Sequence, residues 1–133
     1  SNKEENLAFM EALIMEMGFG RITRISADYH DEMIAFTSQL PHAIAVALVN
    51  SDVEGRETEK FTGDSYRELT RIAKINEELW SELFLENKEY LLKSIQTFED
   101  QLDLIKAAIK NDDSVALKQL FIQSTKRREK FDR

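Results

Sequence analysis

The sequence predicts an all-α protein: a helical bundle with one very long helix, assembled with a second copy as an intertwined homodimer. Only four glycines and one proline interrupt 133 residues, so the chain has few places at which a helix must end. Its apolar residues recur every three or four positions, which is the helical period, rather than alternating as in strands. The length suits a single core, so we expect residues 1–133 to form one helical domain.

The composition excludes several classes of protein. Hydrophobic residues make up 42% of the chain and charged residues 32%, as in ordinary soluble proteins, and no membrane-spanning segment is expected. The net charge of −7 argues against nucleic acid as a ligand, because its binding depends on Lys and Arg neutralising phosphates. The absence of cysteine excludes disulfides and thiolate metal sites and fits the cytoplasm.

The first helix is expected from Lys3 to Met17, with Gly18-Phe19-Gly20 ending it. A short connector, Arg21 to Ile25, follows. Ser26 can then cap the next helix with its hydroxyl, and Asp28 favours the positive end of that helix. The inward-facing residues of the two helices are predicted to be Leu7, Met10, Leu13, Ile14 and Met17, and then Tyr29, Met33, Phe36 and Leu40.

Pro41 is expected to break or kink the second helix. Proline lacks an amide proton and disfavours helical geometry in the residue before it, so a new helix most naturally starts there and places His42 in its opening turn. Ala43 to Val49 are apolar on every side, which is typical of the middle of a bundle or of a subunit interface. Asn50 to Gly63 is the longest polar interruption and is expected to carry a surface loop.

The C-terminal half begins with Ser65 and Glu68, whose capping-box spacing predicts a helix that runs to about Lys74. Helical spacing then continues from Trp80 to Ile109, which predicts the very long helix, with Asn87 as the point where it can bend.

Asn111-Asp112-Asp113 ends the long helix and caps the last one, in which Lys126 to Arg128 suit the negative helix end. A helix of about 30 residues spans ~45 Å, longer than so small a domain is wide, so a partner chain is expected to cover its ends. The alternative is a monomeric bundle with a bent long helix.

Most signatures of chemistry are absent. Gly18 and Gly20 follow a helix rather than a strand, and no third glycine comes three residues later, so the dinucleotide-binding fingerprint is missing. Neither His30 nor His42 has a Glu three residues before it, and on a continuous helix the two would lie ~18 Å apart. No metal site is therefore expected.

Two separated motifs resemble one known family. The first is His30-Asp31, Ala35, Ser38, Leu40-Pro41-His42 and Ala45, which resembles the H-D-x-x-x-A-x-x-S-H-L-P-H-x-x-A signature of the helical C-terminal domain of prephenate dehydrogenase. The second is Thr70-Arg71-Ile72-Ala73 with Trp80 nine residues after the arginine, which looks like that family's T-R-I-A signature followed by a tryptophan. The motifs occur in the right order, and the resemblance covers essentially the whole chain.

The resemblance implies an enzyme in two parts. An N-terminal Rossmann domain, absent from this chain, binds NAD or NADP and carries the catalytic base, while the helical domain forms the dimer and closes over the substrate. The implied reaction is oxidative decarboxylation of prephenate to 4-hydroxyphenylpyruvate in tyrosine synthesis, and this chain alone is expected to be inactive. Prephenate and arogenate both stay open as substrates. The alternative is a helical interaction protein with no enzymatic role.

Arg71 is the first expected substrate-binding residue, because a planar guanidinium binds a carboxylate through two parallel hydrogen bonds. The alternative is a surface pair with Glu68, which could also orient Arg71 or cap the helix with Ser65. His42 matches the histidine that the family places in the substrate pocket; the alternative is a buried histidine bonded to one backbone carbonyl.

Four further residues complete the expected site. Ser38 is a candidate polar contact, and Trp80 is expected to wall the pocket and to anchor the core. His30 is more readily a structural hydrogen-bonding residue than a ligand contact. Gln39 stands where the family often has a histidine, and a glutamine can donate and accept hydrogen bonds but cannot carry positive charge.

Overall fold

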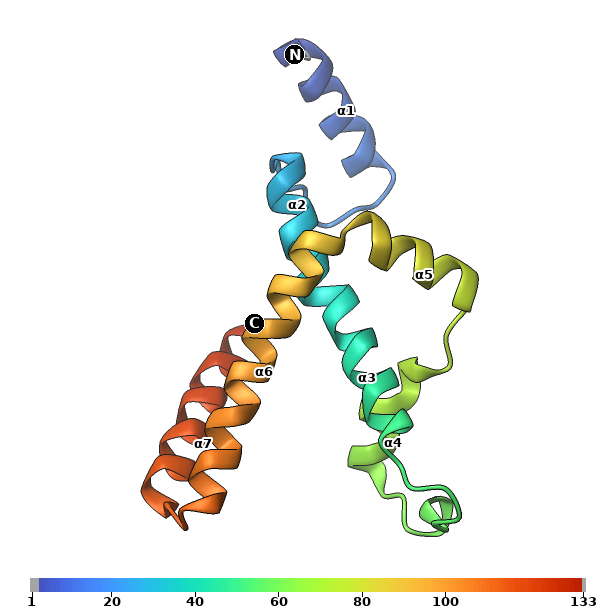
Figure 1. Cartoon of the computed structure of the whole chain (residues 1–133). Coiled ribbons are helices and arrows are strands. Elements are labelled where there is room, and N and C mark those ends of the chain that lie inside the picture. Colours follow the sequence, from blue (N-terminus) through green and yellow to red (C-terminus); the bar gives the residue numbers. More distant parts are fainter. Residues whose placement is uncertain (1–2, 133) are drawn as a thin grey trace. The chain divides into compact units, whose positions relative to one another are not determined.

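A computed structural model describes residues 3–132 and confirms the all-α prediction, because no strand occurs among them (Figure 1). The chain divides into two compact units, one ending at His30 and the other beginning at Asp31. The helices are α1 (Glu4–Glu16), α2 (Ala27–Ile34), α3 (Leu40–Asn50), α4 (Asp64–Thr70), α5 (Glu77–Glu86), α6 (Lys88–Lys110) and α7 (Ser114–Arg128). Shorter turns are η1 (Ala35–Gln39), η2 (Thr58–Lys60), η3 (Arg71–Ala73) and η4 (Glu129–Phe131).

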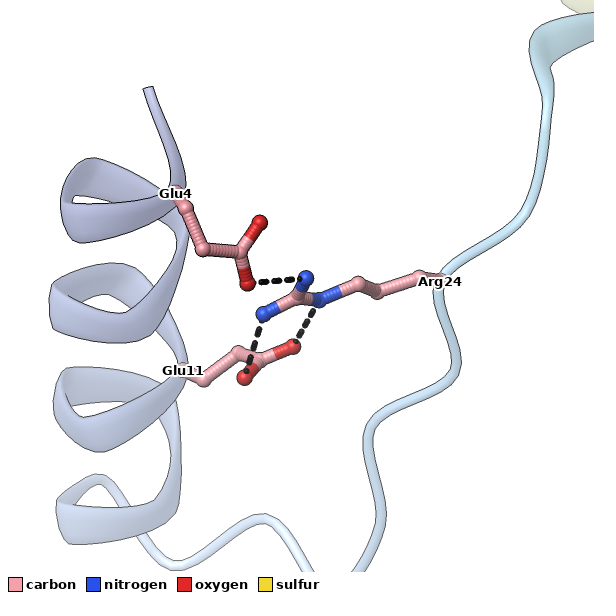
Figure 2. A network of polar contacts seen from close by, with 3 residues as sticks. All are labelled: Glu4, Glu11 and Arg24. Carbon is pink, nitrogen blue, oxygen red and sulfur yellow. Dashed lines mark hydrogen bonds and ion pairs between the residues drawn. The ribbon is translucent and has the colours of Figure 1, made fainter. Parts of the chain in front are cut away.

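In the first unit, α1 ends where the sequence predicts, and Gly18 follows it with a φ of +93°. The extended segment after the helix returns Arg24 to α1 (Figure 2). Arg24 donates from Nε and Nη2 to the two carboxylate oxygens of Glu11, at 2.5 and 3.0 Å, and from Nη1 to Glu4 at 2.7 Å. These bonds lower the pKa of Glu11 and raise that of Arg24. The helix buries none of its residues, so its predicted inward stripe has no cover within this unit.

The second helical run begins at the predicted cap, where Ser26 Oγ accepts a hydrogen bond from the Tyr29 amide at 3.2 Å. Pro41 does not start a separate helix, which corrects the expected break. Instead α2, η1 and α3 form one run, and η1 is a π-helical turn in which the Leu40 amide donates to the carbonyl of Ala35. The wider turn just before Pro41 accommodates the missing proline amide, so the helix continues through it.

The run Ala27–Asn50 is also long and apolar enough to cross a membrane by length and composition alone. Core helices of soluble proteins pass the same test. The expectation that no segment of the chain spans a membrane stays a prediction.

The helix predicted from Ser65 begins one residue earlier, and the predicted capping box is wrong. Gly63 holds the N-cap position, with no side-chain hydrogen bond to the first turn of α4. The helix also ends at Thr70, and Arg71 begins the short turn η3 that precedes an extended Lys74.

The predicted very long helix is interrupted at Asn87. Its backbone φ of −110° and ψ of 30° separate α5 from α6, and Figure 1 shows the two helices running in different directions from that point. The long helix is therefore α6, with 23 residues. Asn76 caps α5 by accepting from the Leu79 amide, and Asp113 caps α7 as predicted, by accepting from Ala116.

The buried apolar core of the described chain is small and lies in the second unit. Its members are Ala35, Leu40, Ala45, Leu91 and Ala108. Three are alanines, which let helix backbones approach closely, and the packing joins η1 and α3 to α6. α6 and α7 pair as a hairpin, and α4 and η3 pack against α3 (Figure 1). Much large apolar surface on these helices stays uncovered.

Candidate functional site

The candidate site is centred on α3 in the second unit, against which Trp80 of α5 stacks and the turn η3 packs. His42, in the first turn of α3, stacks on Trp80 of α5 with ring centroids 3.6 Å apart and planes inclined by 27°. Trp80 in turn meets the edge of Phe84 at 5.9 Å. The stack brings together the two signature motifs, which are far apart in the sequence.

The His42 ring is oriented by the helix that carries it. Nδ1 lies 2.8 Å from the backbone carbonyl of Ser38, one turn earlier. A carbonyl oxygen only accepts hydrogen bonds, so Nδ1 must carry the proton. Nε2 is therefore the ring atom that accepts a hydrogen bond when His42 is neutral and donates one when it is cationic. His42 is half-buried, and Ser38 contributes its carbonyl to this arrangement.

Arg71 lies on η3, which packs against α3. Its side chain is exposed, and in the part of the chain that the structure describes no residue pairs with its guanidinium. The surface pair with Glu68 is therefore not formed. Glu68 is exposed on α4 and takes part in no helix cap, so neither of its predicted structural roles is observed.

Gln39 has protein partners on both ends of its amide. It is 4% exposed; Nε2 donates to the carbonyl of Leu83 at 3.0 Å, and Oε1 accepts from Asn87 Nδ2 at 2.9 Å. The ligand contact expected for Gln39 stays a prediction. Asn87 was not among the expected site residues, although a polar side chain within an apolar helical stripe was the signal that it is needed in the interior.

His30 lies on α2 and belongs to the first unit, where its backbone amide donates to the carbonyl of Ser26 at 3.0 Å. Among residues 3–132 no group of three or more His, Cys, Asp or Glu side chains is placed to hold a metal ion. The chemistry of the site therefore rests on hydrogen bonding: an oriented imidazole against an indole, with a guanidinium on the adjoining turn.

Comparison with known proteins connects this geometry to one family. The family model described as prephenate dehydrogenase, dimerization domain, matches residues 26–123. Cyclohexadienyl dehydrogenase of Zymomonas mobilis is 34% identical over 128 residues, which cover 92% of this chain and 43% of that protein.

Solved structures agree with that match. Arogenate dehydrogenase of Synechocystis superposes with a TM-score of 0.87 at 25% identity, over 97% of this chain and 48% of that one. Prephenate dehydrogenase of Aquifex aeolicus, in complex with hydroxyphenyl propionate and NAD⁺, gives a TM-score of 0.81 at 29% identity, over 96% and 46%. The chain thus spans less than half the length of these relatives.

Proposed function

The chain belongs to the prephenate dehydrogenase dimerization-domain family, and we propose that it is the dimer-forming, substrate-closing part of an NAD- or NADP-dependent prephenate or arogenate dehydrogenase. The family match over residues 26–123, which spans both signature motifs, is the observation that carries this proposal. The reaction is oxidative decarboxylation: a hydride leaves for the nicotinamide, carbon dioxide is lost, and the ring becomes aromatic. With prephenate the product is 4-hydroxyphenylpyruvate.

The nicotinamide cofactor is assigned to a part of the protein outside this chain. None of the four glycines belongs to a G-x-G-x-x-G fingerprint, so these residues do not fit a dinucleotide site. The relatives are more than twice as long as the matched region, which leaves room for a separate nucleotide-binding domain. This chain alone is therefore proposed to be catalytically inactive.

Arg71 and His42 are proposed to hold the substrate's carboxylate groups. The Arg71 guanidinium has no protein partner among the described residues, so its planar donors are available for a bidentate contact. The Ser38 carbonyl fixes the His42 ring and leaves Nε2 for the ligand, while Trp80 covers one face of that ring. Ser38 and Glu68 are proposed as neighbouring polar contacts and His30 as a contact contributed by α2.

A second copy of the chain is proposed to cover the apolar surface left by the small core. Large apolar side chains are exposed along α6 and α7: Leu92, Leu102, Leu104, Ile109, Val115, Phe121 and Ile122. An interface between two copies would bury this surface, as obligate dimers do. We propose that the apolar faces of the run Ala27–Asn50 are covered in the same way, by protein rather than by lipid. We further propose that the enzyme is cytoplasmic and has no metal or nucleic-acid partner.

The full-length protein provides the test. It is expected to sediment as a dimer and to reduce NAD⁺ or NADP⁺ when prephenate or arogenate is added. Arg71→Ala should raise KM for that substrate by about ten- to a hundredfold, because a charge-assisted contact to a carboxylate is lost. Arg67→Ala is the matched control: Arg67 is exposed on α4 one turn earlier and should leave KM unchanged.

Two results would contradict the proposal. Equal KM values for the parent and Arg71→Ala would remove Arg71 from the substrate site. An open reading frame without an upstream strand followed by G-x-G-x-x-G, together with no nicotinamide reduction, would favour the helical interaction protein instead.

A further inference from the structure

The buried amide of Gln39 and the half-buried amide of Asn87 form a polar junction within the second unit. Asn87 Nδ2 donates to Gln39 Oε1 and to the backbone carbonyl of Asp31, both at 2.9 Å. Gln39 Nε2 donates to the carbonyl of Leu83 at 3.0 Å. Two side chains therefore tie together α2, the π-helical turn and the last turn of α5.

Each end of this junction lies where the helix is irregular. Gln39 closes the π-helical turn that precedes Pro41, and Asn87 is the residue at which α5 ends. The Leu83 carbonyl lies in the last turn of α5, where it also accepts a hydrogen bond from the Asn87 backbone amide at 3.3 Å. The two amides therefore add side-chain hydrogen bonds at points where the helices are irregular.

The junction and the His42–Trp80 stack are consecutive contacts between the same two segments. Gln39 lies three residues before His42, and Leu83 lies three residues after Trp80. The segments therefore run antiparallel, with the Gln39–Leu83 hydrogen bond about one helical turn, ~4.5 Å, from the stack. A shift of α5 at Leu83 would move Trp80 by a similar distance.

We propose that Gln39, held by Asn87, is a positioning residue that keeps Trp80 stacked on His42 and so fixes the direction of His42 Nε2. This role rests on the proposed function only in its effect on substrate binding. The glutamine amide suits this role because it donates to Leu83 and accepts from Asn87 at the same time. An amide does not ionise, so both hydrogen bonds are independent of pH. No charged group takes part.

Trp80 is the only tryptophan of this chain, which makes the stack measurable. A stacked imidazole quenches the fluorescence of an indole, so the Trp80 emission should be lower than in a variant that has lost the stack. In the full-length protein this signal is obtained as the difference between the parent and its Trp80→Phe variant. His42→Gln should relieve the quenching and so identify its source.

Gln39→Glu keeps the shape of the side chain but replaces its donor with an acceptor, so the bond to Leu83 cannot form while the carboxylate is ionised. We expect the variant to lose most of the quenching and to raise KM for substrate by about tenfold. Gln96→Glu is the matched control, because Gln96 lies exposed on α6, where its amide donates to the carboxylate of Asp100 on the same helix. It should retain the quenching and the KM of the parent.

Gln39→Met covers the case in which a buried carboxylate prevents folding, since methionine has a similar length and needs no hydrogen bond. Unchanged quenching in whichever variant folds, with the parent's helical circular dichroism, would overturn the positioning role. Failure of the proposed function would look different: the protein would lack dehydrogenase activity, while the quenching would still depend on Gln39.

Discussion

Two polar networks, one in each compact unit, hold their segments in different ways. In the first unit, Arg24 bonds Glu4 and Glu11 at the surface, with 48% of the arginine side chain exposed. In the second unit, Gln39 and Asn87 are neutral amides, and Gln39 is 4% exposed. Two of the three bonds of the charged network are shorter than any bond of the amides, yet the less exposed amides are expected to matter more for stability.

The reason lies in what replaces each network when it is broken. Water and salt solvate an exposed guanidinium and carboxylate, so an exposed ion pair contributes little net free energy. A buried carbonyl or amide that loses its partner keeps the full desolvation penalty. The comparison indicates that burial, rather than charge or bond length, determines how much each polar contact of this chain contributes to the free energy of unfolding.

The largest effect is expected for Asn87→Ala. This change removes the donor to Gln39 Oε1 and to the Asp31 carbonyl, and it should lower the free energy of unfolding of the helical region by about 1–3 kcal/mol. Urea unfolding followed by Trp80 fluorescence measures it. Asn111→Ala, at the exposed C-cap of α6, is the control. A loss no greater than that of the control would break the ranking by burial.

An intermediate effect is expected for Asp113→Ala. Its exposed carboxylate accepts from the Ala116 amide at 2.9 Å, and loss of such an N-cap costs about 1 kcal/mol. Asp112→Asn, which removes a neighbouring charge without removing a cap, should cost less. In the same urea experiment, the loss of unfolding free energy in Asp113→Ala should be smaller than that in Asn87→Ala. A larger loss would contradict this order.

The smallest effect is expected for Arg24→Ala. This variant should show faster amide hydrogen exchange in α1, which is the quantity to measure. Arg21→Ala, in the same extended segment, is the control. Because the hydrogen bonds from Arg24 lower the pKa of Glu11, the protection they give is complete above the ordinary Glu pKa and is lost as pH falls through the lowered value. Protection that is insensitive to this pH change and to about 1 M salt would show that the ion pairs are not what holds Arg24 to α1.

Local rules predicted most of the secondary structure. The limits of α1, the Ser26 cap, the Asp113 cap and the basic last turn of α7 all follow from groups within a few residues of each other. Two local predictions were wrong for the same reason. Ser65 and Pro41 each fit a local rule for the start of a helix. In the folded chain, however, α4 begins at Asp64, and the helix that contains Pro41 continues through a π-helical turn.

The sequence by itself determined that the chain is helical, where most helices begin and end, and which family it belongs to, because caps, helical period and short motifs act over three to nine residues. Only the tertiary structure decided that Gln39 bonds Leu83 and Asn87, at separations of 44 and 48 residues, and that His42 lies on Trp80. Helical periodicity says which face a residue occupies but not which distant face it meets. That choice depends on the break at Asn87, whose half-buried amide finds its partners among backbone and side-chain groups brought together by folding.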